Sequence, residues 1–363
     1  MDRDRYAARR EKLRAALEAE GLDGLIVTRL ANVRYLTGFT GTSGVVLLRG
    51  NESVFFTDFR YRTQAEGELG RCIRVEVVSS DLWGRLWEVL AEGPSPAEVG
   101  FEAQAVSVAD RFRFPENGKF RFRPVEGMVE RLRICKEPEE VAAIGEAARL
   151  AMEALEATLE RVKAGQTELE VAAILEGELR RRGSEWHPFP TIVASGSRTA
   201  LPHARTSCKA IERGEWLLLD FGAQVDGYCA DVTRTVVVGS RPDERQAAVY
   251  EMVREAQLRA RCGIRAGMTG READALARSV IEARGFGEAF GHSLGHGLGL
   301  EVHEGPRLNR TSTEPIPPHA VVTIEPGAYF PGWGGVRIED DVYLAPEGPQ
   351  LLTDGNTELR VVG

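Results

Sequence analysis

The feature that most constrains the fold of this chain is an internal repeat. The stretches "KAGQTELEVAAILEGELRRRG" (163–183) and "RAGMTGREADALARSVIEARG" (265–285) align without gaps at an offset of 102, with seven identities in 21 positions. In each, a Thr is followed three residues later by a Glu, which is the capping-box pattern of a helix N-terminus. "WLLLDFGA" (216–223) likewise corresponds to "VVTIEPGA" (321–328). Two similar helices could match by coincidence, but the second match has a different composition, so the sequence predicts a duplicated unit.

Both halves of the repeat place acidic residues at the ends of apolar strands. Asp220 ends one strand, the turn "QVDGY" follows, and Asp231 lies on the returning strand. Glu325 and Glu339 flank "FPGWGG" symmetrically, so an antiparallel hairpin would make them cross-strand neighbours on one face. A lone Asp at a strand end is usually a solvated turn residue. Four carboxylates beside buried apolar residues need compensating charge, however, and their symmetry predicts a metal site.

Three of the six histidines lie in the glycine-rich stretch "GHSLGHGLGLEVHEG" (291–305). His296 would complete an oxygen-rich ligand set that suits two divalent ions, namely Mn²⁺, Co²⁺ or catalytic Zn²⁺. The glycines disfavour a helix and no HExxH is present, which excludes a zincin-type site. His303 follows His296 at an odd spacing, so a bend or bulge is required for both side chains to reach one site.

Other polar residues near these motifs have simpler interpretations. Asp340 and Asp341 are expected to be solvated or capping residues, and His187 and His319 to be structural. His203 follows a proline in a loop, where a histidine by itself is more often merely exposed.

The remaining sequence predicts a separate N-terminal domain. Residues 1–130 alternate helical and strand patterns, as in an α/β domain. From Pro138, apolar residues recur at steps of three and four until Gly165, which predicts one long amphipathic helix. We therefore expect a second domain over 131–363, of α+β class with a pseudo-two-fold repeat.

Composition excludes several functional classes. The net charge of −9 without a basic block disfavours nucleic acid as a partner. The sequence contains no run of about 18 apolar residues, the length that a membrane-spanning helix needs. The first residues lack the apolar core of a signal peptide. Five scattered cysteines without a CxxC pair disfavour a disulfide framework. A cytoplasmic location is expected.

Several stretches together resemble a known enzyme family. "PHARTS", "DFGAQVDGYCADVTRT", "GHGLGLEVHE" and "IEPGAYF…GVRIEDD" are similar to the signature of the M24 pita-bread metallopeptidases, in particular the Xaa-Pro aminopeptidase and prolidase branch. "LTGFTGTSG…FFTDFRYRTQAE" resembles the creatinase-like N-terminal domain of that branch. The resemblance covers nearly the whole chain.

The resemblance implies a role for each site residue. It makes Asp220, Asp231, His296, Glu325 and Glu339 the ligands of two divalent ions per subunit. Glu325 would also relay a proton, and Arg337 would support the metal carboxylates. The residues implied in substrate binding or in stabilising the tetrahedral intermediate are His203, His303, His292, Phe189 and Arg307. Substrates would be short peptides with proline second, and a homodimer is expected.

Alternatives within and beyond the branch remain. The sequence slightly favours an Xaa-Pro aminopeptidase over an Xaa-Pro dipeptidase (prolidase), because Arg307 could be either a carboxylate anchor or a surface residue. Methionine aminopeptidase would leave the N-terminal domain unexplained. A metal-free binding protein with this fold, or creatinase itself, is disfavoured because all five ligand positions are acidic residues or histidine.

Overall fold

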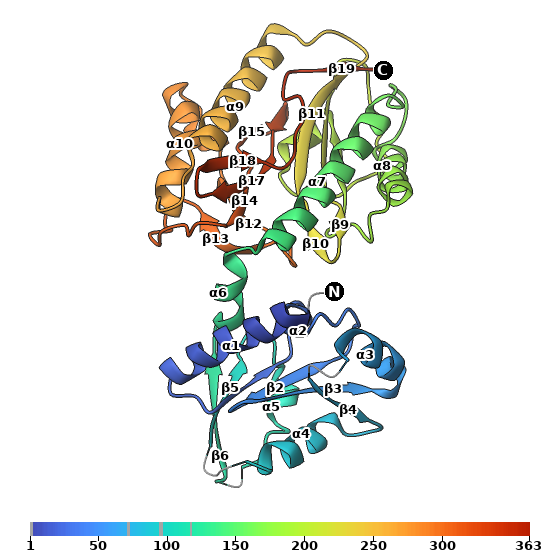
Figure 1. Ribbon diagram of the computed structural model, residues 1–363. Coiled ribbons are helices and arrows are strands. Elements are labelled where there is room, and N and C mark those ends of the chain that lie inside the picture. The colour runs from blue at the N-terminus through green and yellow to red at the C-terminus, as the bar shows by residue number, and fades with distance from the viewer. Residues whose placement is uncertain (1–2, 71–72, 94–96, 117) are drawn as a thin grey trace. The chain divides into compact units, whose positions relative to one another are not determined.

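The computed structural model describes residues 3–70, 73–93, 97–116 and 118–363 (Figure 1). The chain divides into two compact units, Met1–Arg133 and Ile134–Gly363. Among the described residues, no helix is both long and apolar enough to cross a lipid bilayer.

The N-terminal unit is built on one mixed six-stranded sheet, in the order β4-β3-β2-β1-β5-β6. The strands β1, β2 and β3 pair antiparallel, whereas β3–β4, β1–β5 and β5–β6 pair parallel. The strand bounds are β1 (Gly24–Val27), β2 (Val45–Arg49), β3 (Glu52–Asp58), β4 (Arg74–Val78), β5 (Ala97–Glu102) and β6 (Phe120–Val125). The helices are α1 (Arg3–Ala19), α2 (Leu30–Thr37), η1 (Phe59–Tyr61), α3 (Arg62–Leu69), α4 (Leu82–Ala91), α5 (Val108–Arg111) and α6 (Met128–Ile134). Because "GLIV" and "VVLL" are apolar throughout, they form central strands covered on both faces. The predicted α/β class is confirmed.

The C-terminal unit contains two larger sheets and two helix pairs. The sheets have the orders β19-β11-β8-β7 and β13-β12-β14-β17-β18, and β9–β10 and β15–β16 form small hairpins. Their bounds are β7 (Ile192–Ser195), β8 (Trp216–Phe221), β9 (Gln224–Val225), β10 (Tyr228–Cys229), β11 (Val232–Val238), β12 (Gly295–Gly297), β13 (Glu304–Leu308), β14 (Val321–Ile324), β15 (Gly327–Phe330), β16 (Gly334–Arg337), β17 (Asp340–Ala345), β18 (Gly348–Leu351) and β19 (Val361–Val362). The helices are α7 (Pro138–Leu159), α8 (Glu168–Arg182), η2 (Gly196–Ala200), α9 (Glu244–Gly263), α10 (Gly270–Ala283) and η3 (Gly287–Ala289).

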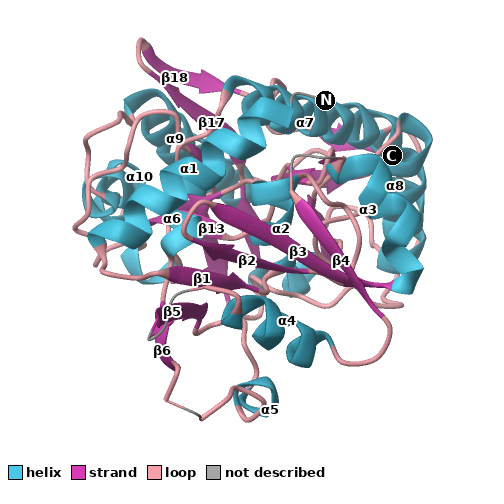
Figure 2. Ribbon diagram, turned by 60° about the horizontal axis from the view of Figure 1, so that its bottom comes forward, coloured by secondary structure: helices cyan, strands magenta, loops and turns pink. Residues whose placement is uncertain are grey.

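Each helix pair covers its own part of the strands. Figures 1 and 2 show α7 and α8 on one side of this unit and α9 and α10 on the other. One apolar core joins α7 and α8 to β7, β8 and β11, and another joins α9 and α10 to β14, β15, β16 and β17. The predicted long helix is α7, which buries Ile144, Ala148 and Leu155 on one stripe. It ends at Leu159, before the glycine that was expected to stop it.

The internal repeat is visible in the hydrogen bonds as well as in the helices. Both α8 and α10 begin with a complete capping box, formed by Thr167 with Glu170 and by Thr269 with Glu272. Just before each helix, equivalent glycine N–H groups donate to equivalent carbonyl oxygens, in the pairs Gly165 N to Ile211 O and Gly267 N to Ile316 O, both at 2.8 Å. The two halves therefore share backbone geometry that sequence identity alone did not reveal.

Candidate metal centre

The first half of the repeat brings Asp220 and Asp231 to one face of the β8–β11 hairpin. Asp220 is the register partner of Thr233, and Asp231 lies two residues before Thr233. Because side chains alternate between faces along a strand, Asp231 and Thr233 share a face. Asp220 is the cross-strand partner of Thr233 and therefore lies on the same face. Between the strands, Asp226 and Gly227 have φ angles of 48° and 73°, as a tight hairpin turn of type I′ requires. Asp220 and Asp231 are both buried.

The second half brings Glu325 and Glu339 together in the predicted register, but across a break between two strand ladders. The pairs Ile324–Asp340 and Gly327–Arg337 have the same register, so Glu325 and Glu339 occupy facing positions. They lie at the break between the β14–β17 and β15–β16 ladders rather than within one hairpin. Their N–H groups donate to other segments, Glu325 N to Leu294 O and Glu339 N to Thr233 O. The break thus ties both glutamates to the strands that carry the other site residues.

His296 lies on β12 and directs Nε2 toward the carboxylates. Its Nδ1 is 3.0 Å from the carbonyl oxygen of Gly297, which can only accept, so Nδ1 carries the proton and Nε2 has a free lone pair. Nε2 lies 3.4 Å from Glu325 Oε1 and 3.8 Å from Asp231 Oδ2. Burial lowers the pKa of His296 to about 4, which keeps the imidazole neutral as a metal ligand must be.

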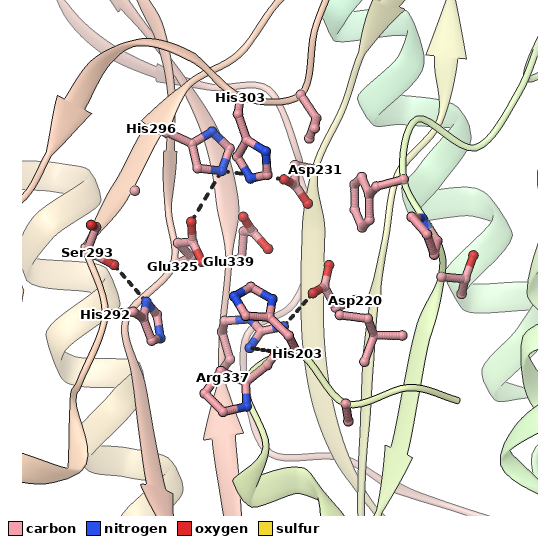
Figure 3. A pocket seen from close by; sticks show the side chains of 18 of the residues that line it. His203, Asp220, Asp231, His292, Ser293, His296, His303, Glu325, Arg337 and Glu339 are labelled. Carbon is pink, nitrogen blue, oxygen red and sulfur yellow. Dashed lines mark hydrogen bonds and ion pairs between the residues drawn. The ribbon is translucent and has the colours of Figure 1, made fainter. Parts of the chain in front are cut away.

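The predicted bend between His296 and His303 is present. The β12–β13 pairing shifts register between His296 and Gly297, and the chain then reverses direction before β13. As a result the two imidazole rings pack edge to face, with centroids 4.4 Å apart (Figure 3). A regular strand would have separated them.

The charges of this cluster fit a divalent metal. Atoms of Asp231, His296 and Glu339 all lie within 4.8 Å of one another. Burial, together with the neighbouring carboxylates, raises the pKa of Asp231 and of Glu339 well above their ordinary values. Burial also raises the pKa of Glu325 to about 8. Carboxylates crowded in this way, with one imidazole nitrogen, form a donor set that suits hard or borderline divalent cations.

Arg337 lies beside the carboxylate cluster, at the centre of a hydrogen-bond network. Its guanidinium is buried and donates to Asp220 Oδ2, to Thr233 Oγ1 at 3.0 Å and to the Tyr329 hydroxyl at 2.8 Å. A further bond of 3.2 Å reaches Pro202 O, next to His203. The Arg337 side chain therefore connects a carboxylate of the cluster with the loop that carries His203.

Two residues that were not predicted to belong to the site bond to the ligand residues. Thr233 Oγ1 donates to Glu339 Oε2 at 2.6 Å. Asp341 Oδ2 accepts from the N–H of Asp231 at 3.0 Å. The hydroxyl of Thr233 lies on the same face as Asp231, and that placement was the available signal.

The expectation that Asp340 and Asp341 are solvated was wrong. Both are fully buried. Asp340 accepts hydrogen bonds from Arg234 at 2.7 Å and from Arg261 at 2.8 Å. An arginine inside the fully buried strand "VTRTVVV" requires a buried carboxylate partner, and Asp340 provides it.

The cluster opens into a cavity of about 700 Å³ that all eleven predicted site residues line, His203, His292, His303, Phe189, Arg307, Arg337 and the five predicted ligands. Figure 3 shows His203 close to Arg337 and Asp220, on the other side of the cluster from His303. His292 Nε2 lies 2.9 Å from the Tyr329 hydroxyl, and burial lowers the pKa of His292 to about 4. His187 and His319 are not among the residues that line this cavity; His187 stacks on Trp186, and His319 bonds to the Tyr343 hydroxyl at 2.7 Å.

The raised pKa of Glu325 predicts how the metal-free protein responds to pH. The ordinary value is 4.5 and the folded value about 8, so the folded chain holds a proton that the unfolded chain has released. This contribution to stability is complete below 4.5 and is lost as the pH rises through about 8. We expect the Tm of EDTA-treated protein to fall between pH 6.5 and 8.5. The Tm of EDTA-treated Glu325→Gln should fall less over this range, because glutamine cannot ionise. An equal fall of Tm in both proteins would contradict the raised pKa of Glu325.

Known protein families match both parts of this chain. The model of metallopeptidase family M24 matches residues 142–346, and that of the creatinase/prolidase N-terminal domain matches residues 9–135. The Xaa-Pro dipeptidase of Pyrococcus furiosus is 38% identical over 97% of this chain and 99% of its own length.

Two solved structures extend the likeness to the whole fold. An Xaa-Pro dipeptidase from Bacillus anthracis has a TM-score of 0.95 at 41% identity, covering 98% of this chain and 100% of that one. An X-Pro aminopeptidase from Thermotoga maritima has a TM-score of 0.88 at 37% identity, covering 97% and 99%. The chain therefore belongs to metallopeptidase family M24 and carries an N-terminal domain of the creatinase/prolidase type.

Proposed function

We propose that this protein is an Xaa-Pro dipeptidase, which hydrolyses the peptide bond before proline in dipeptides. Relatives named Xaa-Pro dipeptidase match the chain over nearly its full length. They support the dipeptidase reading better than the aminopeptidase reading that the sequence slightly favoured. The T. maritima structure keeps an Xaa-Pro aminopeptidase as the second candidate.

The observation that carries this proposal is the position of Arg307. It is exposed on β13, lines the cavity, and is the register partner of His296. Within the described parts of the chain its guanidinium forms no hydrogen bond or ion pair. Its charge nevertheless reaches the site, because burial and then Arg307 lower the pKa of His303. An unpaired guanidinium beside the proposed scissile bond suits the free carboxylate of a C-terminal proline.

The five clustered residues would hold the metal. We propose two divalent ions per subunit, Mn²⁺, Co²⁺ or Zn²⁺, bound by Asp220, Asp231, His296, Glu325 and Glu339. When bound, such ions supply Lewis-acid polarisation of the scissile carbonyl and lower the pKa of a coordinated water. Arg337 and Thr233 hold the carboxylates of Asp220 and Glu339 in fixed orientations.

The chain's own groups move the proton and bind the peptide. The Glu325 carboxylate, which lines the cavity, accepts a proton from the attacking water and passes it to the proline nitrogen. His203 and His303 approach the cavity from two sides and donate to the developing oxyanion. Because an Xaa-Pro bond has no N–H, the apolar face of the proline ring remains for recognition, and Phe189 lies where it can pack against that ring.

The test compares substrates with and without the proline carboxylate. In Arg307→Gln, kcat/KM for an Xaa-Pro dipeptide should fall by about 10- to 100-fold, since a hydrogen bond to a charged group contributes about 1.5–3 kcal/mol. Hydrolysis of the matching Xaa-Pro amide, which lacks that carboxylate, should hardly change. Arg310→Gln is the matched control, because Arg310 pairs with Glu282 and does not line the cavity. Equal cleavage of dipeptides and Xaa-Pro-Xaa tripeptides by the wild type, unaffected by Arg307→Gln, would favour the aminopeptidase.

A further inference from the structure

A buried carboxylate in the first turn of α8 has no part in the mechanism above. Glu168 is fully buried and accepts hydrogen bonds from both ends of the same loop. Oε1 accepts from Ser195 N at 2.8 Å and Ser195 Oγ at 3.0 Å. Oε2 accepts from Ser207 N at 3.0 Å and Ser207 Oγ at 2.6 Å. The two carboxylate oxygens thus close residues 196–206 into a loop.

The charge of Glu168 is balanced from inside that loop. Arg198 Nε lies 3.1 Å from Oε1 and 3.2 Å from Oε2. The same guanidinium also donates to Arg205 O, two residues after His203. Arg198 therefore links the Glu168 carboxylate to the segment that carries His203.

The opposite side of the loop is held by the metal centre. Arg337 donates to Pro202 O at 3.2 Å, immediately before His203, and to the Asp220 carboxylate. The loop around His203 is therefore fixed on two sides, by Arg337 at the metal cluster and by Glu168 at the two ends of the loop. Hydrogen-bond donors work only when they are held at the position of the developing charge, so the loop's geometry is part of the chemistry.

We propose that Glu168 is a positioning residue that holds His203 in the site through the 196–206 loop. The inference rests on the proposed function, in which His203 stabilises the oxyanion. Glu168 touches neither substrate nor metal residues; it acts through Ser195, Arg198 and Ser207.

The other half of the repeat fills the same place differently. The residue equivalent to Glu168 at the start of α10 is Gly270, and a Cβ there would collide with the carbonyl oxygen of Arg307 and with Ser312. In both halves, then, the first residue of the repeated helix contacts a segment that carries a cavity residue. Backbone contact alone suffices beside Arg307. The loop that carries His203 is held instead by a side chain with two acceptor oxygens.

Glu168→Gln isolates this role with little change in shape. One amide oxygen can still accept, but the –NH₂ group faces donors and cannot. Either the Ser195 end or the Ser207 end of the loop is therefore released. We expect kcat for an Xaa-Pro dipeptide to fall by about 10- to 100-fold, with KM and bound metal close to wild type. Ser207→Ala, which removes one donor, should show a smaller loss of the same kind.

A double-mutant cycle separates positioning from mere stability. If Glu168 acts through His203, Glu168→Gln should cause no further loss of kcat in a His203→Ala background. Glu140→Gln is the control, because Glu140 is an equally buried carboxylate of the same unit that bonds to Tyr228, away from the loop. It should lower Tm without lowering kcat.

The outcomes are distinguishable from a failure of the proposed function. Losses that multiply in the double variant, or a kcat that falls only in proportion to lost metal, would overturn the positioning role alone. Full activity of His203→Ala would overturn the role of that histidine and the inference with it. A wild-type protein that fails to cleave any Xaa-Pro dipeptide with metal bound would instead overturn the proposed function.

Discussion

Glu339→Gln and Asp231→Asn are each expected to abolish peptide hydrolysis and to lower the bound metal. Each change replaces a charged oxygen donor by a neutral amide of the same shape within a cluster whose atoms lie within 4.8 Å of one another. Loss of metal chemistry removes several kcal/mol of transition-state stabilisation, so kcat/KM should fall about a thousandfold or more. Metal content by elemental analysis and dipeptide turnover measure both effects.

The same variants should fold normally without metal. Burial and mutual repulsion raise the pKa of both carboxyls, so an amide at either position removes a cost of ionisation. The Tm of the EDTA-treated variants should therefore match or exceed that of EDTA-treated wild type. Asp226→Asn makes the same chemical change at the exposed hairpin turn, where Asn also tolerates positive φ, and should leave metal and turnover intact. Two metals per chain with near-native turnover in Glu339→Gln would refute the metal assignment.

Replacement of His296 and of His303, whose rings pack edge to face, should separate a metal ligand from a hydrogen-bond donor. His296→Ala should lose metal, because Nε2 of His296 points at Glu325 and Asp231. His303→Ala should keep metal yet lose about 10²–10³-fold in kcat, which is typical of removing one oxyanion donor.

The two histidines have nearly the same surroundings, since their ring centroids are only 4.4 Å apart, so a difference between the variants reflects the role of each side chain. His187→Ala, at a histidine that does not line the cavity, serves as the control and should change neither quantity. Identical metal content and kinetics in His296→Ala and His303→Ala would show that the proposed division of roles is wrong.

The sequence alone predicted the features that depend on local chemistry. The duplicated capping boxes and the apolar strands "WLLLD" and "VVTIE" are readable because helix caps and strand burial follow from residue type and spacing. Likewise, the odd spacing of His296 and His303 required a bend, and the structure contains one. The family resemblance, which the comparisons confirmed, suggested the proposed roles of individual residues.

Only the tertiary structure decided which polar residues lie behind the site. Asp340 and Asp341 look like a solvated pair beside a strand, yet both are buried. Asp340 pairs with Arg234 of β11, and Asp341 accepts a hydrogen bond from the N–H of Asp231. Glu168 looks like any acidic residue in the first turn of a helix, where the helix dipole favours negative charge. Its bonds to Ser195 and Ser207 join residues 27 and 39 positions away. Such contacts leave no periodic pattern in the sequence, since they arise only when separate segments are packed and every buried charge must find a partner.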